Sequence, residues 1–327
     1  DYYSKLLTNQ SRPFYNNATQ EKTAPGSTYK PLSAIAGLTE GVIDVNTYLP
    51  CAGVYKKVTP NPKCWIYPNA HGSLDVSGAI ENSCNSFFYE VGYRLSLKDN
   101  GINSISQDNN QGDATNAYYS SELGLQKLSK YAQMFGLGTT SGMEIPEADP
   151  QISDDSSVPS AIGQGTNNYT VSQINRYVTA VANRGTVYSL SLIDKTTDSN
   201  GKLIKDYTPE VVNQMDEISS STWDLVHNGM ESMVKSSSTF AGMDISMGGK
   251  TGTAQYSKMH ADNVLFVGYA PADSPEISIA VRIANGYAST YAAEIGRDIT
   301  KVYFNPESAD ELLQGHASSL GTAEAGD

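Results

Sequence analysis

The stretch "APGSTYKP" at Ala24–Pro31 decides how the rest of the chain is interpreted. Ser27 and Lys30 stand three positions apart in it, and Pro31 follows at once. Because proline has no N–H to donate, it is tolerated only in or next to the first turn of a helix. The sequence therefore predicts a helix that starts near Ser27 and ends at Gly41. Its residues are apolar or small on every face, which predicts a buried central helix.

Ser27 and Lys30 lie on one face of this predicted helix, so a hydroxyl and an amine can meet there. A serine hydroxyl is a poor nucleophile until a base removes its proton. A lysine can be that base if burial or a second cation lowers its pKa, and a helix N-terminus also favours a neutral amine and a developing oxyanion. The alternative is an ordinary helix start with a surface lysine, since S-x-x-K often occurs by chance.

A second candidate group is "SCN" at Ser83–Asn85, at a predicted junction of two helices. Its hydroxyl can relay a proton and its carboxamide can hold a substrate amide, although serine and asparagine are also common helix caps.

The third group is "GGKTGTAQ" around Lys250, predicted as a strand whose glycines let a substrate backbone approach closely. A glycine-rich strand turn is the alternative. A phosphate-binding loop is excluded because the spacing G-x-x-x-x-G-K-[ST] is absent.

Together and in this order, the three motifs resemble those of class A β-lactamases and penicillin-binding proteins. Nearly the whole chain is similar to the transpeptidase domain of class B penicillin-binding proteins. "NNATQEKTAPGSTYKP" resembles the family's N-R-A-T-Q entry and its P-G-S-T-x-K-P motif, with Asn17 where arginine is usual. "GLGTTSGMEIPE", "AIGQG", "VSQINRYVTAVANRG" and "LFVGYAPAD" match further landmarks in order, and the N-A-T-Q stretch indicates the cell-elongation type.

This resemblance implies a serine D,D-transpeptidase that cross-links peptidoglycan stem peptides. Ser27 would attack the D-Ala–D-Ala amide and release D-Ala, with Lys30 as its general base. An amine of a second stem peptide would then take the acyl group, and β-lactams would acylate Ser27 in place of the donor. The resemblance also implies that Ser83 relays a proton and that the Asn85 amide orients the substrate. Around the substrate carboxylate it places Lys250, Thr251, Gly252 and Thr253. The backbone N–H groups of Ser27 and Thr253 would form the oxyanion hole.

Two other functions share these motifs. A serine β-lactamase would hydrolyse the acyl-enzyme, but a water-activating glutamate in the pattern E-x-x-L-N is absent, and Glu144 and Glu147 lie in an expected loop. A non-catalytic β-lactam sensor would be acylated once and signal, but the N-A-T-Q entry does not favour it.

The segments of regular pattern predict an α+β protein in which an antiparallel sheet is flanked by a helical cluster. The resemblance implies that this is the penicillin-binding/serine β-lactamase-like fold. We expect one transpeptidase domain over residues 1–305 and an acidic, flexible tail over residues 306–327. A polar stretch near residues 98–121 has no periodicity and is expected to be a surface insertion. The helix "ELGLQKLSKYAQMFGLG" is expected to stop at Gly138.

The net charge of −13 argues against nucleic acid or an anionic membrane surface as the main partner. No run of 18 or more apolar residues is present, so nothing in the sequence is expected to span a membrane.

The resemblance implies that the full-length protein acts at the extracytoplasmic face of the bacterial cell membrane, anchored by an N-terminal helix absent here. A glycan polymerase of the elongation machinery is the partner that the family implies.

The cysteines form a cluster in the sequence. Cys51, Cys64, His71 and Cys84 make the pattern C-x12-C-x6-H-x12-C, and three thiolates with one imidazole are a complete tetrahedral zinc set. The resemblance supports zinc, since some elongation-type members hold zinc beside the active site. A Cys51–Cys64 disulfide, or simply buried thiols, are the alternatives, and Asp75 can replace one ligand. Because Cys84 lies inside the second motif, we expect zinc loss to disturb catalysis.

Overall fold

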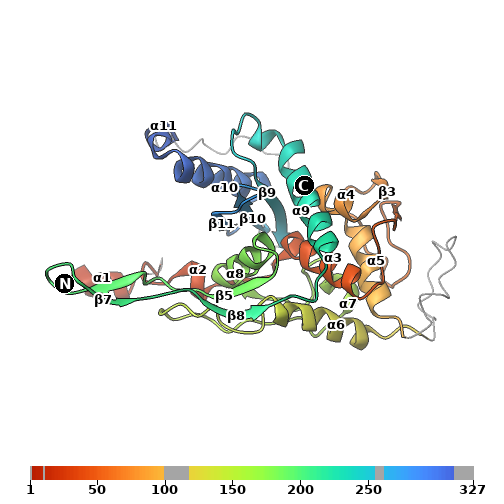
Figure 1. Cartoon of the computed structure of the whole chain (residues 1–327). Coiled ribbons are helices and arrows are strands. Elements are labelled where there is room, and N and C mark those ends of the chain that lie inside the picture. Colours follow the sequence, from red (N-terminus) through yellow and green to blue (C-terminus); the bar gives the residue numbers. More distant parts are fainter. Residues whose placement is uncertain (1, 10–11, 99–117, 255–260, 313–327) are drawn as a thin grey trace.

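The computed structural model of the chain describes residues 2–9, 12–98, 118–254 and 261–312, and its elements confirm the predicted α+β class (Figure 1). The helices are α1 (Tyr2–Leu7), α2 (Asn17–Gln20), η1 (Gly26–Tyr29), α3 (Lys30–Thr39), α4 (Val76–Glu81), α5 (Asn85–Leu95), α6 (Ser121–Met134), α7 (Ser157–Ser160), α8 (Val171–Ala182), α9 (Ser220–Ser236), η3 (Ser238–Phe240), α10 (Ser289–Phe304), η4 (Pro306–Ser308) and α11 (Ala309–Leu312). The strands are β1 (Lys22–Thr23), β2 (Leu49–Cys51), β3 (Gly72–Leu74), β4 (Tyr169–Thr170), β5 (Thr186–Ser189), β6 (Lys195–Thr197), β7 (Leu203–Asp206), β8 (Glu210–Gln214), β9 (Gly248–Ala254), β10 (Asn263–Ala270) and β11 (Ile277–Ile283).

The largest sheet within the described ranges is antiparallel, with the strand order β11-β10-β9. Its central strand, β10, is buried along its whole length. Val264 and Phe266 belong to one hydrophobic cluster with α10, whereas Leu265 and Val267 belong to another that includes α3 and α8. Because successive side chains of a strand point to opposite faces, this alternation shows that both faces of the sheet are covered.

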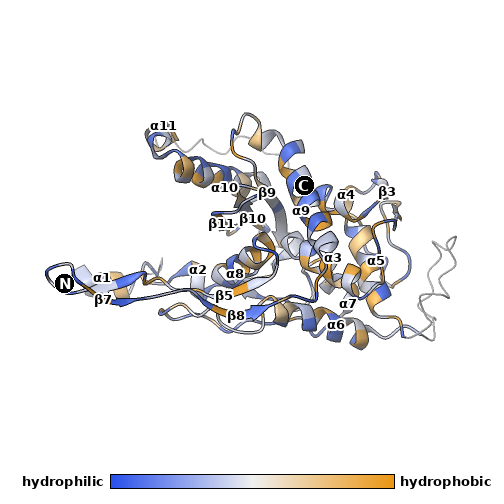
Figure 2. Ribbon diagram, in the orientation of Figure 1, coloured by the Kyte–Doolittle hydropathy of each residue, from blue (hydrophilic) through white to orange (hydrophobic). Residues whose placement is uncertain are grey.

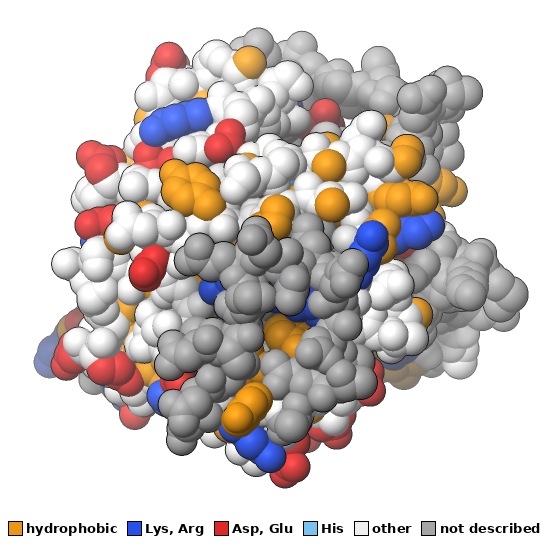
Figure 3. Space-filling model, turned by 90° about the vertical axis from the view of Figure 1, so that its right-hand side faces the viewer, with side chains coloured by type: hydrophobic (Ala, Val, Ile, Leu, Met, Phe, Trp, Pro, Cys, Tyr) orange, Lys and Arg blue, Asp and Glu red, His pale blue; other side chains and the backbone are white. Residues whose placement is uncertain are grey.

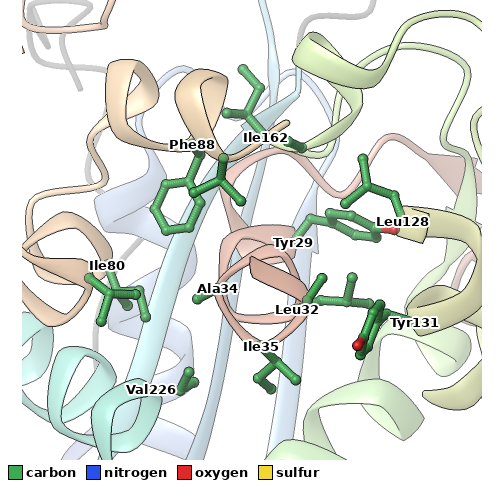
Figure 4. Packing of buried hydrophobic residues seen from close by; sticks show 14 of the residues in the cluster. Tyr29, Leu32, Ala34, Ile35, Ile80, Phe88, Leu128, Tyr131, Ile162 and Val226 are labelled. Atoms are coloured by element: carbon green, nitrogen blue, oxygen red, sulfur yellow. The ribbon is translucent and has the colours of Figure 1, made fainter. Parts of the chain in front are cut away.

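Helix α3 lies at the centre of the larger cluster, as its apolar sequence predicted. Leu32, Ala34 and Ile35 are completely buried and point in different directions, toward residues of α4, α5, α6 and α9 (Figure 4). A helix that is apolar on every face has no polar face to expose to solvent, so it is stable only when other elements surround it. Central burial of α3 therefore fixes the position of η1, which directly precedes it in the chain.

The helices around this centre are amphipathic, and polar and apolar residues alternate along them (Figure 2). Helix α8 begins with a capping box, in which the Thr170 hydroxyl accepts from Gln173 N and the Gln173 side chain accepts from Thr170 N. On the face that Figure 3 shows, apolar side chains lie in small groups between polar and charged ones.

Two predicted helix boundaries differ from the structure. Ser27 lies in the 3₁₀ turn η1, and α3 begins only at Lys30, because Pro31 occupies its first turn. The predicted stop of α6 at Gly138 is wrong. The helix ends at Met134, and Gly136 adopts the left-handed conformation with φ of 79°, which glycine reaches without steric cost.

Most of the predicted insertion near residues 98–121 lies outside the described residues. At its edges Leu97 and Tyr119 form an antiparallel bridge, and α6 begins at Ser121, so the two ends of the insertion lie close together. Of the predicted tail, residues 306–312 form η4 and α11, and the remainder is outside the described residues. None of the described helices combines the length and the apolar character needed to cross a membrane.

The contact between η1 and β9 can be tested by adding a methyl group at Gly26. Gly26 has a φ of 51°, and a Cβ there would lie 2.3 Å from the carbonyl oxygen of Thr253. Gly242 has a φ of 76° with no heavy atom within 4 Å of a Cβ, so it is the matched control. We expect Gly242→Ala to lower the free energy of unfolding by about 1 kcal/mol and Gly26→Ala by at least about 2 kcal/mol more, measured by urea denaturation. Equal losses would contradict the close approach of the two segments.

Candidate active site

The hydroxyl-bearing Ser27 lines an open cleft with a volume of about 700 Å³. The cleft is bounded by η1, by the α4–α5 junction and by β9, so the structure brings together the three motifs that the sequence singled out. Around Ser27 the backbone is held firmly. Thr28 donates its hydroxyl proton to the Pro25 carbonyl at 2.7 Å, and the Tyr177 hydroxyl donates to the Thr28 carbonyl at 3.1 Å.

Lys30 is completely buried, and three oxygen atoms of the second motif lie around its amine. Lys30 Nζ lies 2.6 Å from the Ser83 carbonyl oxygen, 3.1 Å from Ser83 Oγ and 2.6 Å from Asn85 Oδ1. Burying an amine is costly unless hydrogen bonds replace its hydration, so the second motif compensates for the burial of Lys30. The surface-lysine alternative for the first motif is therefore wrong.

The junction of α4 and α5 presents these oxygens because of an unusual backbone turn at Ser83. Its φ of 51° is in the left-handed region, which a residue with a side chain adopts only at an energetic cost. Cys84 then caps the N-terminus of α5, and Asn85 is the first residue of that helix. The turn aims the Ser83 carbonyl at Lys30, a contact that no side-chain pattern in the sequence indicates.

The third motif is β9, at the edge of the described sheet. Lys250 is completely buried and its amine donates to the Thr251 carbonyl at 3.2 Å, whereas Thr251, Gly252 and Thr253 line the cleft. A Cβ at Gly252 would lie 2.8 Å from the side chain of Thr28, so glycine is needed for η1 and β9 to pack this closely.

Several cleft residues were not singled out from the sequence. Gln164, in the "AIGQG" stretch, donates its side-chain amide to the Thr253 carbonyl at 3.4 Å. Trp65 donates its indole N–H to the Asn82 carbonyl at 3.1 Å, and Tyr287 adopts a φ of 63° at another part of the cleft lining. The only sequence signal for Gln164 was its place in a landmark stretch, and Trp65 has none beyond its position next to Cys64.

The four residues of the cysteine pattern converge beside the cleft. The three sulfur atoms and a ring nitrogen of His71 all lie within 4.8 Å of one another, and all three cysteines are buried and unoxidised. His71 Nδ1 is 3.5 Å from Cys51 Sγ and 3.6 Å from Cys64 Sγ. The Cys51–Cys64 disulfide alternative is therefore not formed in this structure. The alternative ligand Asp75 instead caps α4, where its carboxylate accepts from Gly78 N at 2.7 Å.

The donor set and its geometry fit a zinc ion. Bonds of about 2.3 Å to sulfur and about 2.0 Å to nitrogen at tetrahedral angles place the two ligand atoms about 3.5 Å apart. Hydrogen bonds from the Cys84 thiol and from backbone N–H groups lower the pKa of the Cys64 thiol to about 4. The same pairing with Cys64, together with burial, raises the pKa of Cys84. One of the donors is Asn85 N, 3.3 Å from Cys64 Sγ, so the cluster contacts the residue that also binds Lys30.

Comparison with known families agrees with this arrangement. The family model described as the penicillin binding protein transpeptidase domain matches residues 2–301, and the chain belongs to this family. The predicted class B resemblance and fold are thereby confirmed.

Individual relatives are similar over most of the chain. The peptidoglycan D,D-transpeptidase MrdA of Haemophilus influenzae is 26% identical over 352 aligned positions, which cover 93% of this chain and 48% of that protein. The chain thus spans about half the length of the curated relatives it matches. The structure of Pseudomonas aeruginosa PBP2 in complex with WCK 5153 has a TM-score of 0.73 and 25% identity, covering 93% of this chain and 64% of that one. Penicillin-binding protein A from M. tuberculosis, solved as a penicillin G acyl-enzyme complex, shares the fold with a TM-score of 0.75 and 20% identity, covering 93% and 66%.

The Lys30 contacts predict a measurable loss of stability when Asn85 is truncated. Asn85→Ala removes the Oδ1 acceptor and leaves a buried amine with one partner fewer, which costs about 1–3 kcal/mol. Asn82→Ala is the control, because the Asn82 side chain only donates to the Gly78 carbonyl at an exposed position. Its expected cost is about 0.5 kcal/mol or less. Denaturant unfolding of both variants measures the difference, and an Asn85→Ala protein as stable as wild type would refute the contact.

Proposed function

We propose that this chain is the acyl-transferring domain of a peptidoglycan D,D-transpeptidase in which Ser27 is the nucleophile. The observation that carries the proposal is the meeting of Ser27, the Lys30 amine with its oxygen ligands, and the Thr251–Thr253 edge of β9 on one cleft. A nucleophile, a base and a binding edge at one place are what acyl transfer requires.

The surroundings of Lys30 support its role as general base. A neutral amine has two N–H bonds and one lone pair. The Ser83 carbonyl and Asn85 Oδ1 are acceptors that can take the two N–H bonds, both at 2.6 Å. The lone pair is then left for a hydroxyl proton, either from Ser27, three residues earlier on η1, or from Ser83 Oγ at 3.1 Å. In this role Asn85 orients Lys30 and Ser83 relays the proton.

The reaction follows in two acyl transfers. Ser27 Oγ bonds to the carbonyl carbon of the D-Ala–D-Ala amide while its proton moves to Lys30, and the backbone N–H groups of Ser27 and Thr253 stabilise the oxyanion. The C–N bond breaks, and the departing D-Ala nitrogen takes the proton by way of Ser83. An amine of a second stem peptide then attacks the ester carbonyl and gives one of its own protons to Lys30. The ester C–O bond breaks, and Ser27 Oγ takes that proton from Lys30. A β-lactam acylates Ser27 by the same first step, and its opened ring stays attached. Lys250 and Thr251 hold the carboxylate of either ligand.

The environments of Glu144 and Glu147 disfavour the β-lactamase alternative. Glu147 accepts from the hydroxyls of Ser141, Thr170 and Ser172, and Glu144 accepts from Ser191 and from a neighbouring backbone N–H. Neither glutamate is among the described residues that line the cleft. Both carboxylates are thus occupied elsewhere, and neither can activate a water at Ser27.

A donor–acceptor assay tests the proposed function. With a D-Ala–D-Ala stem peptide as donor and a second stem peptide as acceptor, we expect release of D-Ala and a cross-linked dimer. Ser27→Ala and Lys30→Ala should each lower the rate at least about 10³-fold, because each acts in the same proton transfer. Ser236→Ala, another hydroxyl of the cleft lining, should change the rate less than about threefold. Acylation by penicillin without any peptide turnover would instead indicate a sensor.

We also propose that Cys51, Cys64, His71 and Cys84 bind zinc. The metal would cross-link β2, the segment around Cys64 and the N-terminus of α5. Cys84 stands between Ser83 and Asn85, and Cys64 accepts from Asn85 N, so the ligands hold the residues that surround the Lys30 amine. Zinc loss is therefore expected to loosen the α4–α5 junction and slow acylation of Ser27.

Metal analysis tests this site. Protein purified without added zinc should contain about one zinc per chain, and Cys64→Ser should lose most of it. The same substitution should lower the Tm by roughly 5 °C or more, since a ligand set left incomplete no longer ties the segments together. Ser73→Ala, an exposed residue on β3, is the control. A zinc-free protein with unchanged Tm and full reaction with penicillin would overturn the site.

The place of action and the partners are proposed on the family relationship. The full-length protein is expected to be anchored in the bacterial cell membrane, with this domain on the extracytoplasmic side, where the stem peptides are. A glycan polymerase of the elongation machinery would supply the uncross-linked strands.

A further inference from the structure

A short loop after α7, residues 161–165, touches both segments that carry the oxyanion hole of the proposed reaction. The Gly163 carbonyl accepts from Gly26 N at 3.1 Å, on η1. The next residue of the loop, Gln164, donates its side-chain amide to the Thr253 carbonyl on β9 at 3.4 Å. Two consecutive residues of one loop therefore bridge η1 and β9, and the proposed reaction gives neither of them a role.

The Thr253 carbonyl that Gln164 binds points the same way as the Thr253 N–H. In an antiparallel sheet the N–H and the C=O of one residue are directed to the same side of its strand. The structure agrees, because the nitrogen and the carbonyl oxygen of Thr253 both lie within 3.3 Å of the place that a Cβ on Gly26 would occupy. Both groups therefore face η1, and a side chain that holds the carbonyl also fixes the direction of the N–H.

The 161–165 loop is itself firmly held. Ser33 Oγ, buried in α3, donates to the Ala161 carbonyl at 2.7 Å. The Gln164 backbone is held on both sides, since its N–H donates to the Pro159 carbonyl at 3.1 Å and its carbonyl accepts from Asn167 Nδ2 at 3.0 Å. The Gln164 side chain thus extends from a fixed backbone, and dipoles that are fixed before the substrate arrives need no reorganisation during the reaction.

The loop, η1 and β9 are stacked in direct contact. Gly163 has a φ of 73°, and a Cβ on it would clash with the carbonyl oxygen of Gly26. Gly26 in turn lies against the backbone of Thr253. Because no side chain separates the three segments, a shift of the loop changes the distance between η1 and β9.

We propose that Gln164 is a positioning residue for the oxyanion hole. By holding the Thr253 carbonyl to the 161–165 loop, its side-chain amide sets the distance and the angle between the N–H groups of Thr253 and Ser27. Gln164 acts through Thr253 and contributes no atom to the bonds that form or break. This inference rests on the proposed function, because an oxyanion forms only when Ser27 is acylated. The hydrogen bond of 3.4 Å is expected to shorten in the acyl-enzyme, as hydrogen bonds of catalytic sites often do when a ligand binds.

The substitution Gln164→Met tests this role, because methionine keeps the length of the side chain and removes its N–H groups. Stopped-flow acylation of the full chain at several penicillin concentrations separates the binding constant from the acylation rate constant. We expect the rate constant to fall about 10- to 100-fold, because a displaced donor weakens the transition state. The binding constant should change less than about threefold. An unchanged rate constant with weaker binding would make Gln164 a ligand-contacting residue and overturn the proposal.

The infrared carbonyl band of the acyl-enzyme gives a second readout. Hydrogen bonds from the oxyanion hole polarise the ester C=O bond and lower its stretching frequency. With penicillin labelled at that carbonyl, the Gln164→Met acyl-enzyme should therefore absorb at a higher wavenumber than the wild type. A band at the same wavenumber in both proteins would contradict the positioning role.

The matched control is Asn213→Leu. Asn213 Nδ2 donates to the Met134 carbonyl at 2.8 Å, so this substitution also removes a bond from a side-chain amide to a main-chain carbonyl. Asn213 is not among the described residues that line the cleft. We expect the control to lower the Tm but to leave the acylation rate constant and the carbonyl band unchanged. A control that changed them as much as Gln164→Met would show a general loss of stability and overturn the proposal.

NMR of the unreacted protein separates this test from the reaction. In Gln164→Met the amide resonances of Ser27 and Thr253 should shift together, because the 161–165 loop bridges η1 and β9, and both should stay in place in Asn213→Leu. If penicillin does not acylate the wild type, the proposed function fails. A joint shift then still supports the coupling of the two N–H groups, whereas a shift at Thr253 alone, or at neither, refutes it.

Discussion

The arrangement of the whole site depends on the burial of one amine. Lys30 has no access to water, so the protein must supply its hydrogen-bond partners, and all three described oxygen atoms come from Ser83 and Asn85. This contact ties η1 and α3 to the α4–α5 junction across more than 50 residues of sequence. It also explains the strained backbone at Ser83, since the left-handed turn is what directs the carbonyl at the amine.

The other parts of the structure hold this contact in place. Helix α3 is apolar on all sides and sits in the middle of the larger core, which fixes the depth of Lys30. Gly26 and Gly252 let η1 and β9 pack closely, because Gly26 lies against the backbone of Thr253 and Gly252 lies against the side chain of Thr28. The cluster of three cysteines and His71 contacts the second motif, because Cys64 Sγ accepts from Asn85 N. An ion bound by this cluster would therefore act on the second motif rather than on the nucleophile itself.

The sequence was sufficient to predict the central helix and to single out three motifs that the structure brings to one cleft. The apolar body after Pro31, the glycine-rich strand around Lys250 and the C-x12-C-x6-H-x12-C pattern each led to residues that the structure brings together. Contacts made by the main chain were not predictable, because any residue has a carbonyl, and only the fold directs that of Ser83 to Lys30. The same holds for Gln164, whose reach to Thr253 depends on a loop conformation. The stop of α6 was misplaced because glycines stand at 136 and 138, and only the local φ distinguishes them.

The central claim, that Ser27 is the acylated residue of this cleft, is tested most directly by mass spectrometry after incubation with penicillin. The account predicts one penicilloyl group per chain, located by peptide mapping on the fragment that contains Ser27, and still attached after hours in buffer. An adduct on another residue, no adduct at all, or rapid loss of the adduct with turnover of the antibiotic would contradict it.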